Sequence, residues 1–479
     1  MIETKTNKSD KDILTWDQRL GQQVNQAWEN YKHVRIDLST ARLDFPLLIA
    51  GEFLYVEERS GVLALAKIKL NRNTNDALDL EKGVEIYTVF KEVYITNDAL
   101  QGEWLDLVFG INFIYKKKII EEDHILFGGP GCVAVTPRFD FTAGQVWVLV
   151  DDVFVQYLVS GVAANIPLAA GQSIEFVASE WDSITLIDFA TNNVTGDISG
   201  WVLPTSLVTF YVYSTSVSGD ISGWVLPASL AYFLVNLTSV SGDISGWVLP
   251  ASLVTLSVNS TSVSGDISGW VLPANLAYFY VYSTSVSGDI SGWVLPASLV
   301  TFYVNSTSVS GDISGWVLPA NLVTFYVYST SVSGDISGWV LPASLAYFLV
   351  CSTSVSGDIS GWVLPASLAY FLVYSTSVSG DISGLVLPAG IQYIYIYITQ
   401  LDYDFAGGAF TGITNALIKI DFDDCLLAQA QVDNILADCV TSLINNKQLD
   451  LAGTNAAPSA AGLLDKATLI ARGWVVATN

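Results

Sequence analysis

Apolar residues recur at a fixed spacing through the middle of the chain. Gly-Asp pairs begin at Gly196 and return every 23 residues as far as Gly380. The unit LVTFYVYSTSVSGDISGWVLPAS shows the pattern that each repeat carries. Its apolar positions are Leu207, Phe210, Val212, Val217, Ile221, Trp224 and Leu226. A fixed period in this range is typical of a solenoid, in which each repeat forms one turn of a continuous coil.

The parts of one repeat predict its local structure. The alternating segment LVTFYVY predicts a short strand with one face turned inward. Ser-Gly-Asp is a turn signal, because glycine can take a positive φ and aspartate can bond the backbone two residues on. Pro227 blocks a helix before the next strand, so we expect the convex side to be extended or 3₁₀-helical. A stacked aromatic column is expected from Trp201, Trp224, Trp247, Trp270, Trp293, Trp316, Trp339 and Trp362, with Leu385 in the ninth unit.

The same register extends beyond the clear copies. The additional apolar positions are Ile184, Ile187, Phe189 and Val194 before them, and Ile391, Ile394, Ile396 and Leu401 after them. Residues 417–427 repeat the pattern once more after a three-residue slip. A lone unit buries too few side chains to offset its ordering entropy, so the units are stable only as a stacked array. The solenoid is therefore predicted over residues 176–427.

The repeat resembles a leucine-rich repeat of the subtype with a GxI turn after the strand. The matching pattern is LxxLxL followed by GxI, and Thr215 stands where the family usually has Asn or Cys. This resemblance implies a mainly β solenoid whose outward strand positions form the usual binding surface.

The two ends of the chain have different patterns. We expect an N-terminal arm over 1–35, helical at 14–32, then a β-sandwich-like attachment domain over 36–127 and a small β domain or N-cap over 128–175. Residues 428–479 predict a small α/β cap, in which a helix over 428–443 is followed by a strand, a short helix and a final strand. This last stretch resembles the C-terminal cap on leucine-rich-repeat proteins of tailed phages and some marine bacteria. Residues 67–110 also resemble an N-terminal domain of phage virion proteins.

The composition of the chain argues against several classes of binding partner. The chain has 479 residues, 51% of them hydrophobic and 14% charged, with a formal net charge of -25. Such a field repels nucleic acid, so we expect no nucleic-acid partner. The first residues contain no apolar segment of a signal peptide, and no run of eighteen apolar residues predicts membrane insertion. Four cysteines without CxxC spacing and only two histidines predict neither a zinc site nor a disulfide framework.

Tyrosines dominate the outward strand positions. The candidate contact residues are Tyr211, Tyr213, Tyr232, Tyr278, Tyr280, Tyr282, Tyr303, Tyr326, Tyr328, Tyr347, Tyr370 and Tyr374. Tyrosine suits stacking on sugar rings or on another protein, because it combines apolar area with a hydroxyl group. A second use is self-association of identical subunits, and the remaining alternative is that tyrosine simply suits strands. Leu234, Asn236, Ser257, Asn259, Asn305, Leu349 and Leu372 occupy further outward positions.

Nine aspartates at 23-residue steps, from Asp197 to Asp381, predict a column of carboxylates. Each carboxylate either caps its own turn or shares cations with its neighbours, and calcium requires six to eight oxygen ligands. The turn-capping interpretation is favoured, so no metal site and no cofactor are predicted. Identical groups repeated along an array do not converge into a catalytic site, and no catalytic residue is predicted.

These patterns favour a non-enzymatic structural and binding protein. With the resemblance of both ends, they predict a phage virion fibre or decoration protein, located on the virion or outside the cell. Its partners would be sister virion subunits, within a homo-oligomer, and a glycan of the host surface. The alternative is a bacterial extracellular adhesin or filament-forming surface protein.

Overall fold

A computed structural model describes strands within the first 128 residues and most of residues 134–479. In the second range, positions 145, 152, 169–171, 179, 398, 405–409, 411–412, 415 and 443 lie outside the described residues. The chain forms two compact units. The first contains residues 1–124, 147–156 and 174–177, and the second contains residues 125–146, 157–173 and 178–479.

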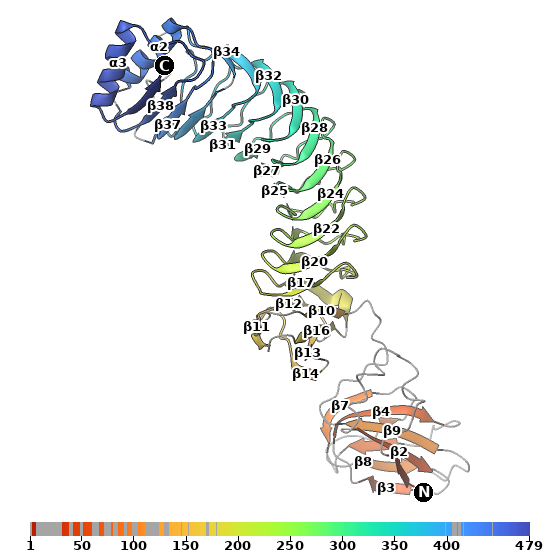
Figure 1. Cartoon of the computed structure of the whole chain (residues 1–479). Coiled ribbons are helices and arrows are strands. Elements are labelled where there is room, and N and C mark those ends of the chain that lie inside the picture. The colour runs from red at the N-terminus through yellow and green to blue at the C-terminus, as the bar shows by residue number, and fades with distance from the viewer. Residues whose placement is uncertain are drawn as a thin grey trace. The chain divides into compact units, whose positions relative to one another are not determined.

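The N-terminal residues form two antiparallel sheets, as a β-sandwich requires (Figure 1). One sheet has the order β1 (Ile2–Lys5), β2 (Tyr31–Asp37), β9 (Trp104–Gly110), β4 (Gly51–Arg59), β7 (Glu85–Phe90). The other has the order β3 (Arg42–Leu47), β8 (Val93–Asn97), β5 (Lys67–Leu70), β6 (Leu78–Asp79). Strand β1 pairs with β2, so both ends of the predicted arm lie in the first sheet. The helix predicted over 14–32 is wrong from Tyr31 onward, and residues 14–30 lie outside the described residues.

Short strands precede the repeats. One sheet has the order β10 (His124–Gly128), β16 (Ser173–Ala178), β13 (Val146–Val150), β14 (Val153–Tyr157), and β11 (Ala134–Val135) pairs with β15 (Ile166–Pro167). Strand β12 (Arg138–Phe141) runs antiparallel to β17 (Ile184–Asp188), the first strand of the array.

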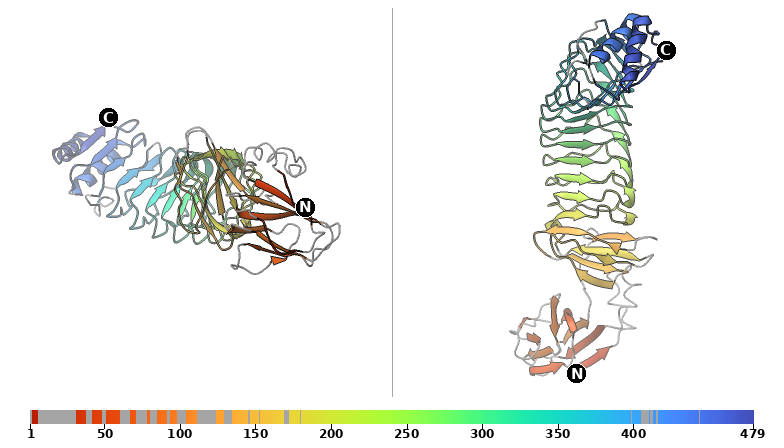
Figure 2. Two further views of the ribbon diagram at one scale, coloured as in Figure 1. Left: turned by 90° about the horizontal axis from the view of Figure 1, so that it is seen from below. Right: turned by 90° about the vertical axis from the view of Figure 1, so that its left-hand side faces the viewer.

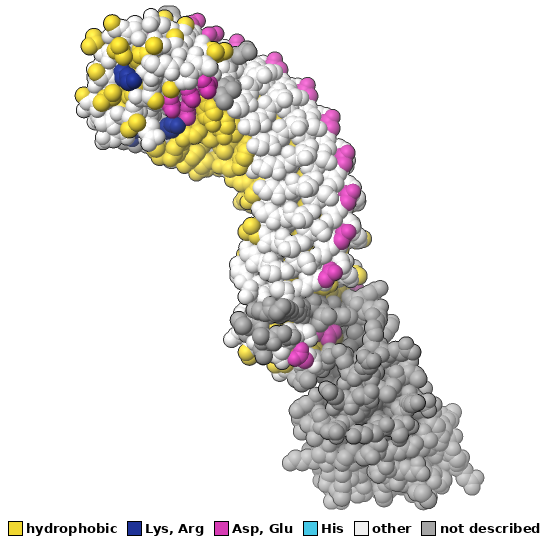
Figure 3. Space-filling view, viewed as in Figure 1, with side chains coloured by type: hydrophobic (Ala, Val, Ile, Leu, Met, Phe, Trp, Pro, Cys, Tyr) yellow, Lys and Arg dark blue, Asp and Glu magenta, His cyan; other side chains and the backbone are white. Residues whose placement is uncertain are grey.

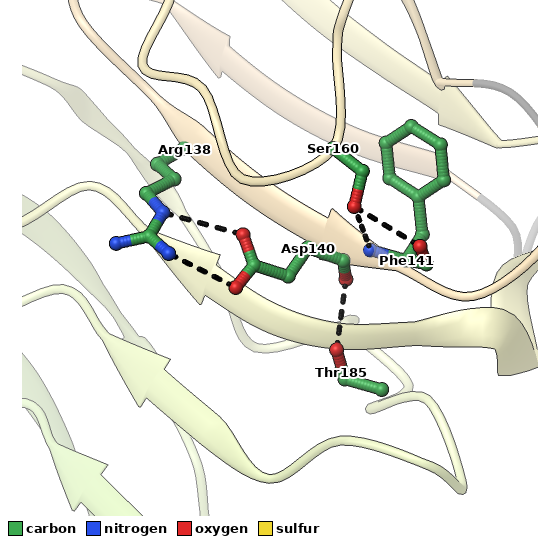
Figure 4. Close-up of polar contacts among 5 residues, drawn as sticks. All are labelled: Arg138, Asp140, Phe141, Ser160 and Thr185. Carbon is green, nitrogen blue, oxygen red and sulfur yellow. Dashed lines mark hydrogen bonds and ion pairs between the residues drawn. The ribbon is translucent and has the colours of Figure 1, made fainter.

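Strand β12 is fixed by polar contacts on both sides (Figure 4). The Arg138 guanidinium donates to both carboxylate oxygens of Asp140, at 3.2 and 3.1 Å. The Asp140 carbonyl accepts from the Thr185 hydroxyl at 3.2 Å, and the Phe141 N–H donates to the Ser160 hydroxyl at 2.9 Å. This strand therefore covers the open edge of the first repeat, as an N-cap must.

The 23-residue repeats stack as rungs of a bent solenoid, which confirms the predicted architecture (Figure 2). A parallel sheet lines the inside of the bend, and we call it the inner sheet (Figure 1). After β17 it contains β19 (Thr209–Tyr211), β21 (Tyr232–Leu234), β23 (Thr255–Ser257), β25 (Tyr278–Tyr280), β27 (Thr301–Tyr303), β29 (Thr324–Tyr326), β31 (Tyr347–Leu349), β33 (Tyr370–Leu372), β35 (Tyr393–Tyr395) and β37 (Lys419–Asp421). From β19 to β35 each strand pairs with the residues 23 positions on.

A second parallel sheet, which we call the outer sheet, corrects one prediction. It contains β18 (Thr195–Asp197), β20 (Ser216–Asp220), β22 (Ser239–Asp243), β24 (Ser262–Asp266), β26 (Ser285–Asp289), β28 (Ser308–Asp312), β30 (Ser331–Asp335), β32 (Ser354–Asp358), β34 (Ser377–Asp381) and β36 (Gln400–Asp402). The Ser-Gly-Asp segment, predicted as a turn, is therefore the end of a strand. The local features behind that prediction are nevertheless present. Gly219 has a φ of 129°, and the Asp220 carboxylate accepts from the Ser222 N–H at 2.9 Å.

The turn between the two sheets uses a left-handed residue in each rung. Ser214 has a φ of 54°, and Leu237 at the equivalent position has a φ of 56°. The next residue in the first of these rungs, Thr215, donates its hydroxyl to the Val212 carbonyl at 2.7 Å. Threonine thus bonds the backbone within this turn, where the leucine-rich-repeat family usually has Asn or Cys.

The core follows the predicted apolar positions. Leu207, Phe210, Val212, Val217, Ile221, Trp224 and Leu226 are all buried. The phenylalanines stack from rung to rung, for example Phe279 on Phe302 with ring centroids 5.4 Å apart. The tryptophans do not stack on one another as predicted, because the indoles pack against phenylalanine rings, mostly edge-on and on both sides where both neighbouring rungs supply a phenylalanine. Trp293, for example, is 5.8 Å from Phe279 and 6.4 Å from Phe302.

The third side of each rung carries no strand of either sheet. The Leu230 N–H donates to the Pro227 carbonyl at 3.0 Å, which closes a tight turn into the next inner strand. Residues 198–397 contain no helix within the described positions, in agreement with the extended side predicted from Pro227. No helix in the described part of the chain is long and apolar enough to span a bilayer.

The C-terminal cap has the predicted elements. Helix α2 (Gln429–Thr441) is followed by β38 (Gln448–Leu451), α3 (Ala460–Ala471) and β39 (Val475–Thr478). Strands β38 and β39 continue the inner sheet in parallel. Val432, Ile435, Leu436 and Cys439 of α2 are buried as expected, and Leu443 lies outside the described residues. The domain limits proposed from the sequence remain a prediction.

Candidate ligand-binding face

The twelve candidate tyrosines all lie on the solvent side of the inner sheet or in the segment directly after its strands. We call this set the tyrosine face: Tyr211, Tyr213, Tyr232, Tyr278, Tyr280, Tyr282, Tyr303, Tyr326, Tyr328, Tyr347, Tyr370 and Tyr374. They alternate with buried residues such as Phe302 and Val304, because successive side chains of a strand point to opposite faces. Apolar side chains gather on the inside of the bend in the space-filling view (Figure 3).

Tyrosine rings on neighbouring rungs pack against one another. Tyr303 stacks on Tyr326 with centroids 4.3 Å apart and planes 5° apart. Tyr280 meets Tyr303 edge-on at 5.2 Å, and Tyr347 lies 4.9 Å from Tyr370. The rings are therefore half-buried side by side along runs of neighbouring rungs, and they present a tyrosine-rich surface there.

Burial raises the pKa of several phenol groups on this face. It raises the pKa of Tyr303 well above the usual tyrosine range, with Tyr326 as the next contributor. Burial also raises the pKa of Tyr280, Tyr326 and Tyr328. No charged residue occupies an outward position of the inner sheet between residues 209 and 397. These four phenols with a raised pKa are thus hydrogen-bond donors at neutral pH, on a face without charged side chains.

One rung interrupts the tyrosines with small polar residues. Ser257 and Asn259, predicted as outward, lie on the solvent side but are only 4% exposed. The Ser257 hydroxyl lies 2.8 Å from the Asn259 amide oxygen and 3.0 Å from that of Asn236. On the next rung the larger Tyr280 lies directly beside Ser257 in the sheet, which accounts for part of this burial. This rung therefore places buried polar side chains between two rungs that carry tyrosines.

Asn305 is a second buried amide on this side of the sheet. It is 3% exposed, and its side-chain oxygen has no hydrogen-bond partner. An unpaired buried acceptor is costly, so the aromatic face carries unsatisfied hydrogen-bonding capacity at this rung.

The tyrosine face extends beyond the predicted residues. Tyr393, Tyr395 and Tyr397 continue it, and Tyr374 stacks on Tyr397 at 4.3 Å. The segment IQYIYIY carries the signal for them, since Ile394 and Ile396 alternate with them as inward residues.

Charge appears at the C-terminal end of the inner sheet. The Lys419 ammonium donates to the Asp421 carboxylate at 2.7 Å and lies 5.2 Å from the Tyr395 ring centroid. Both side chains occupy outward positions of the strand that follows the last tyrosine rung. These two residues were not among the predicted contacts, although the alternation in LIKIDF indicates their placement.

The aspartates form the predicted column along the edge of the outer sheet (Figure 3). Each carboxylate accepts from the backbone N–H two residues on, from Asp197 to Asp381, at 2.9 Å. Hydrogen bonds from Ser222 hold the pKa of Asp220 below its usual value. These bonds are turn caps, as favoured from the sequence. Within the described residues, no group of three or more His, Cys, Asp or Glu side chains is placed to hold a metal ion.

The cysteines within the described residues are buried and unpaired. Burial raises the pKa of the Cys351 thiol to about 11 and that of Cys425 to about 12. Both thiols are therefore protonated at neutral pH and unreactive. Cys132 lies outside the described residues.

Comparison with known proteins finds similarity to solved structures alone. No family model and no curated protein matches the sequence. Similar solved structures include the plant peptide hormone receptor RGFR1 in complex with RGF2, at 15% identity and a TM-score of 0.36, over 62% of this chain and 60% of the receptor chain. An internalin from Listeria monocytogenes has 16% identity and a TM-score of 0.32, over 63% of this chain and 89% of the internalin. The chain thus spans less than two thirds of the receptor's length, and neither similarity bears on what this chain binds.

Proposed function

We propose that this chain is a non-enzymatic structural and binding protein whose tyrosine face contacts a repetitive ligand. The supporting observation is the uncharged, tyrosine-rich surface on the inside of the bend, built from near-identical rungs. A surface that repeats every rung suits a ligand or partner that also repeats, since each rung then makes an equivalent contact.

A glycan of a host surface fits this face best among the repetitive ligands considered. Sugar rings stack on tyrosine through their apolar faces and bond phenols and amides through their hydroxyl groups. Tyr232 and Tyr278 are each 38% exposed, so rings and phenol groups on this face are accessible for both kinds of contact. The absence of charge from the outward positions between residues 209 and 397 favours a neutral saccharide over an anionic one.

The larger setting that we propose is a phage virion. The solenoid would act as a rigid spacer, and the N-terminal sheets would attach it to the particle or to sister subunits. Support comes from the resemblance of the C-terminal cap and of residues 67–110 to segments of phage proteins. Purification of particles tests this setting, and we expect the chain to co-purify with virions. Its recovery from a bacterial surface instead would favour the adhesin alternative.

Binding of the full chain to a panel of neutral envelope polysaccharides tests the ligand. We expect the triple variant Tyr280→Ser, Tyr303→Ser, Tyr326→Ser to bind at least about tenfold more weakly, because truncating buried aromatic contacts is costly. The matched control replaces three exposed serines of the outer sheet, Ser262, Ser285 and Ser308, by alanine.

A second variant separates stacking from hydrogen bonding and guards against misfolding. Tyrosine-to-phenylalanine changes at the same three positions keep the rings and remove only the phenol groups. If serine and phenylalanine variants both bind every polysaccharide as the native chain does, the tyrosine face is not the binding surface. If no polysaccharide binds the native chain, the glycan proposal is wrong.

A further inference from the structure

One valine in each rung points into solvent. We call this row the valine ridge: Val225, Val248, Val271, Val294, Val317, Val340, Val363 and Val386. The first seven are 82–85% exposed and the last is 74% exposed. Such values are close to those of a free side chain, so the valines are almost unburied by their own fold.

The ridge results from the alternation in the Trp-Val-Leu-Pro segment. Trp293 and Leu295 point into the core at 6% and 9% exposure, which turns Val294 outward. The segment lies on the third side of the rung, which carries neither the tyrosine face nor the strands of the outer sheet. The exposed residues beside the valines are glycine, serine and alanine, with asparagine at Asn275 and Asn321, and none of them is charged. The third side thus carries a long row of apolar side chains among uncharged neighbours.

An exposed strip of this size marks an interaction surface in soluble proteins. At roughly 130 Å² for each side chain, the ridge offers on the order of 1,000 Å², whereas a standard interface uses about 800 Å² on each partner. A contact over half of the ridge, together with its alanine neighbours, reaches the lower end of that range. This area is smaller than that of most obligate complexes, so we expect a reversible association.

We propose that the valine ridge docks the valine ridge of a second copy of this chain. Two rows of side chains interdigitate along their length only when the side chains are equally spaced in both rows. A second copy of this chain has the same distance between rungs, so its valine ridge meets this condition. Contact of the same surface on both copies gives a closed two-fold dimer. Both tyrosine faces remain free in this dimer, so this inference goes beyond the proposed function.

Because the chain is strongly acidic, the effect of salt on dimerisation is a second test of the proposal. The formal net charge of -25 opposes association of two copies. Added salt screens this repulsion and leaves apolar contact intact. We therefore expect the dimer fraction to rise with sodium chloride concentration, opposite to the behaviour of an interface held by ion pairs.

Analytical ultracentrifugation of the full chain across the micromolar range tests the proposal. We expect the native chain to shift from monomer to dimer mass. The variant Val248→Ser, Val271→Ser, Val294→Ser, Val317→Ser is expected to raise the dissociation constant at least about tenfold. The matched control changes four exposed serines of the outer sheet, Ser262, Ser285, Ser308 and Ser331, to alanine.

Two further variants distinguish loss of the interface from misfolding and from an effect of the tyrosine face. Threonine at the same four positions keeps the branched shape of valine and replaces one methyl group by a hydroxyl group. We expect this threonine variant to weaken the dimer even if the serine variant folds poorly. Thermal melting checks the fold of each variant. The tyrosine-to-serine triple variant is expected to dimerise as the native chain does. A native chain that stays monomeric, ridge variants with an unchanged dissociation constant, or loss of the dimer in the tyrosine variant would each overturn the proposal. Polysaccharide binding by the ridge variants reports separately on the tyrosine face.

Discussion

Replacing Gly288 by alanine is expected to destabilise the array strongly. Gly288 has a φ of 121°, a region that side-chain-bearing residues rarely adopt. A Cβ atom built there would clash with the Asp266 carboxylate of the preceding rung and lie 2.8 Å from the Ser268 backbone nitrogen. The new methyl group therefore meets a backbone atom that cannot simply rotate away.

Most of the expected loss of stability comes from the backbone conformation at Gly288. Forcing alanine into a sparsely populated region of this kind costs about 1–3 kcal/mol. The clash also displaces the Asp266 carboxylate from the Ser268 N–H, from which it accepts a hydrogen bond at 2.9 Å. We expect the free energy of unfolding to fall by at least about 2 kcal/mol.

The matched control lies in the same rung. A Cβ atom added at Gly292 would have nothing within 4 Å of it, and Gly292 does not have a positive φ. Gly292→Ala is expected to be neutral or to stabilise by up to about 1 kcal/mol, because alanine restricts the unfolded chain. Guanidinium chloride denaturation followed by circular dichroism measures both variants, provided that the slope with denaturant is unchanged. Equal midpoints for the two variants would refute the reasoning.

Four further changes test other contacts of the rung. Asp243→Asn keeps an oxygen that accepts the turn bond but loses the charge that strengthens it, so it should melt slightly below the native temperature, and Asp243→Ala should melt lower still; an alanine variant as stable as the asparagine variant would contradict turn capping. Phe302→Ala should cost about 3–5 kcal/mol, and Phe302→Leu should cost clearly less in the same denaturation assay, because Leu256 fills the equivalent position naturally. Leu237→Asn should stabilise by about 0.5–1 kcal/mol because asparagine tolerates the left-handed φ of 56° better than leucine; a loss of stability would argue against strain there. Burial raises the pKa of Tyr303, so the stability that this group contributes below its ordinary pKa of 10.0 should be lost as pH rises above that value, and Tyr303→Phe should flatten the decline in denaturation midpoints.

The sequence was sufficient to predict the rung and its core. The 23-residue period and the alternation around Phe210 and Val212 fix which side chains point inward, because burial of one face leaves no freedom of register. The tyrosines follow from the same alternation, since the residues between two inward positions must face outward. The placement of the candidate face could therefore be predicted, while its role in binding remains a prediction.

The outer sheet could not be predicted from local signals. Its strands, such as Ser216–Asp220, contain one buried valine and end in Gly-Asp, which is a turn signature in an isolated chain. They become strands because stacked neighbours supply parallel partners for their backbone groups. The valine ridge was missed for a related reason. Val225 looks like a core residue, and only the inward positions of Trp224 and Leu226 on either side reveal that it faces solvent.

Each boundary between neighbouring rungs repeats the same bonds, from the pairing of Gly219 with Val240 to that of Gly357 with Val378. Excision of one 23-residue unit would therefore join two surfaces that already match. Slippage between such similar gene segments would lengthen or shorten the protein by one unit at a time, about 4.8 Å of reach per event. The distance spanned by this chain is consequently a trait that can drift quickly in a lineage without a loss of folding.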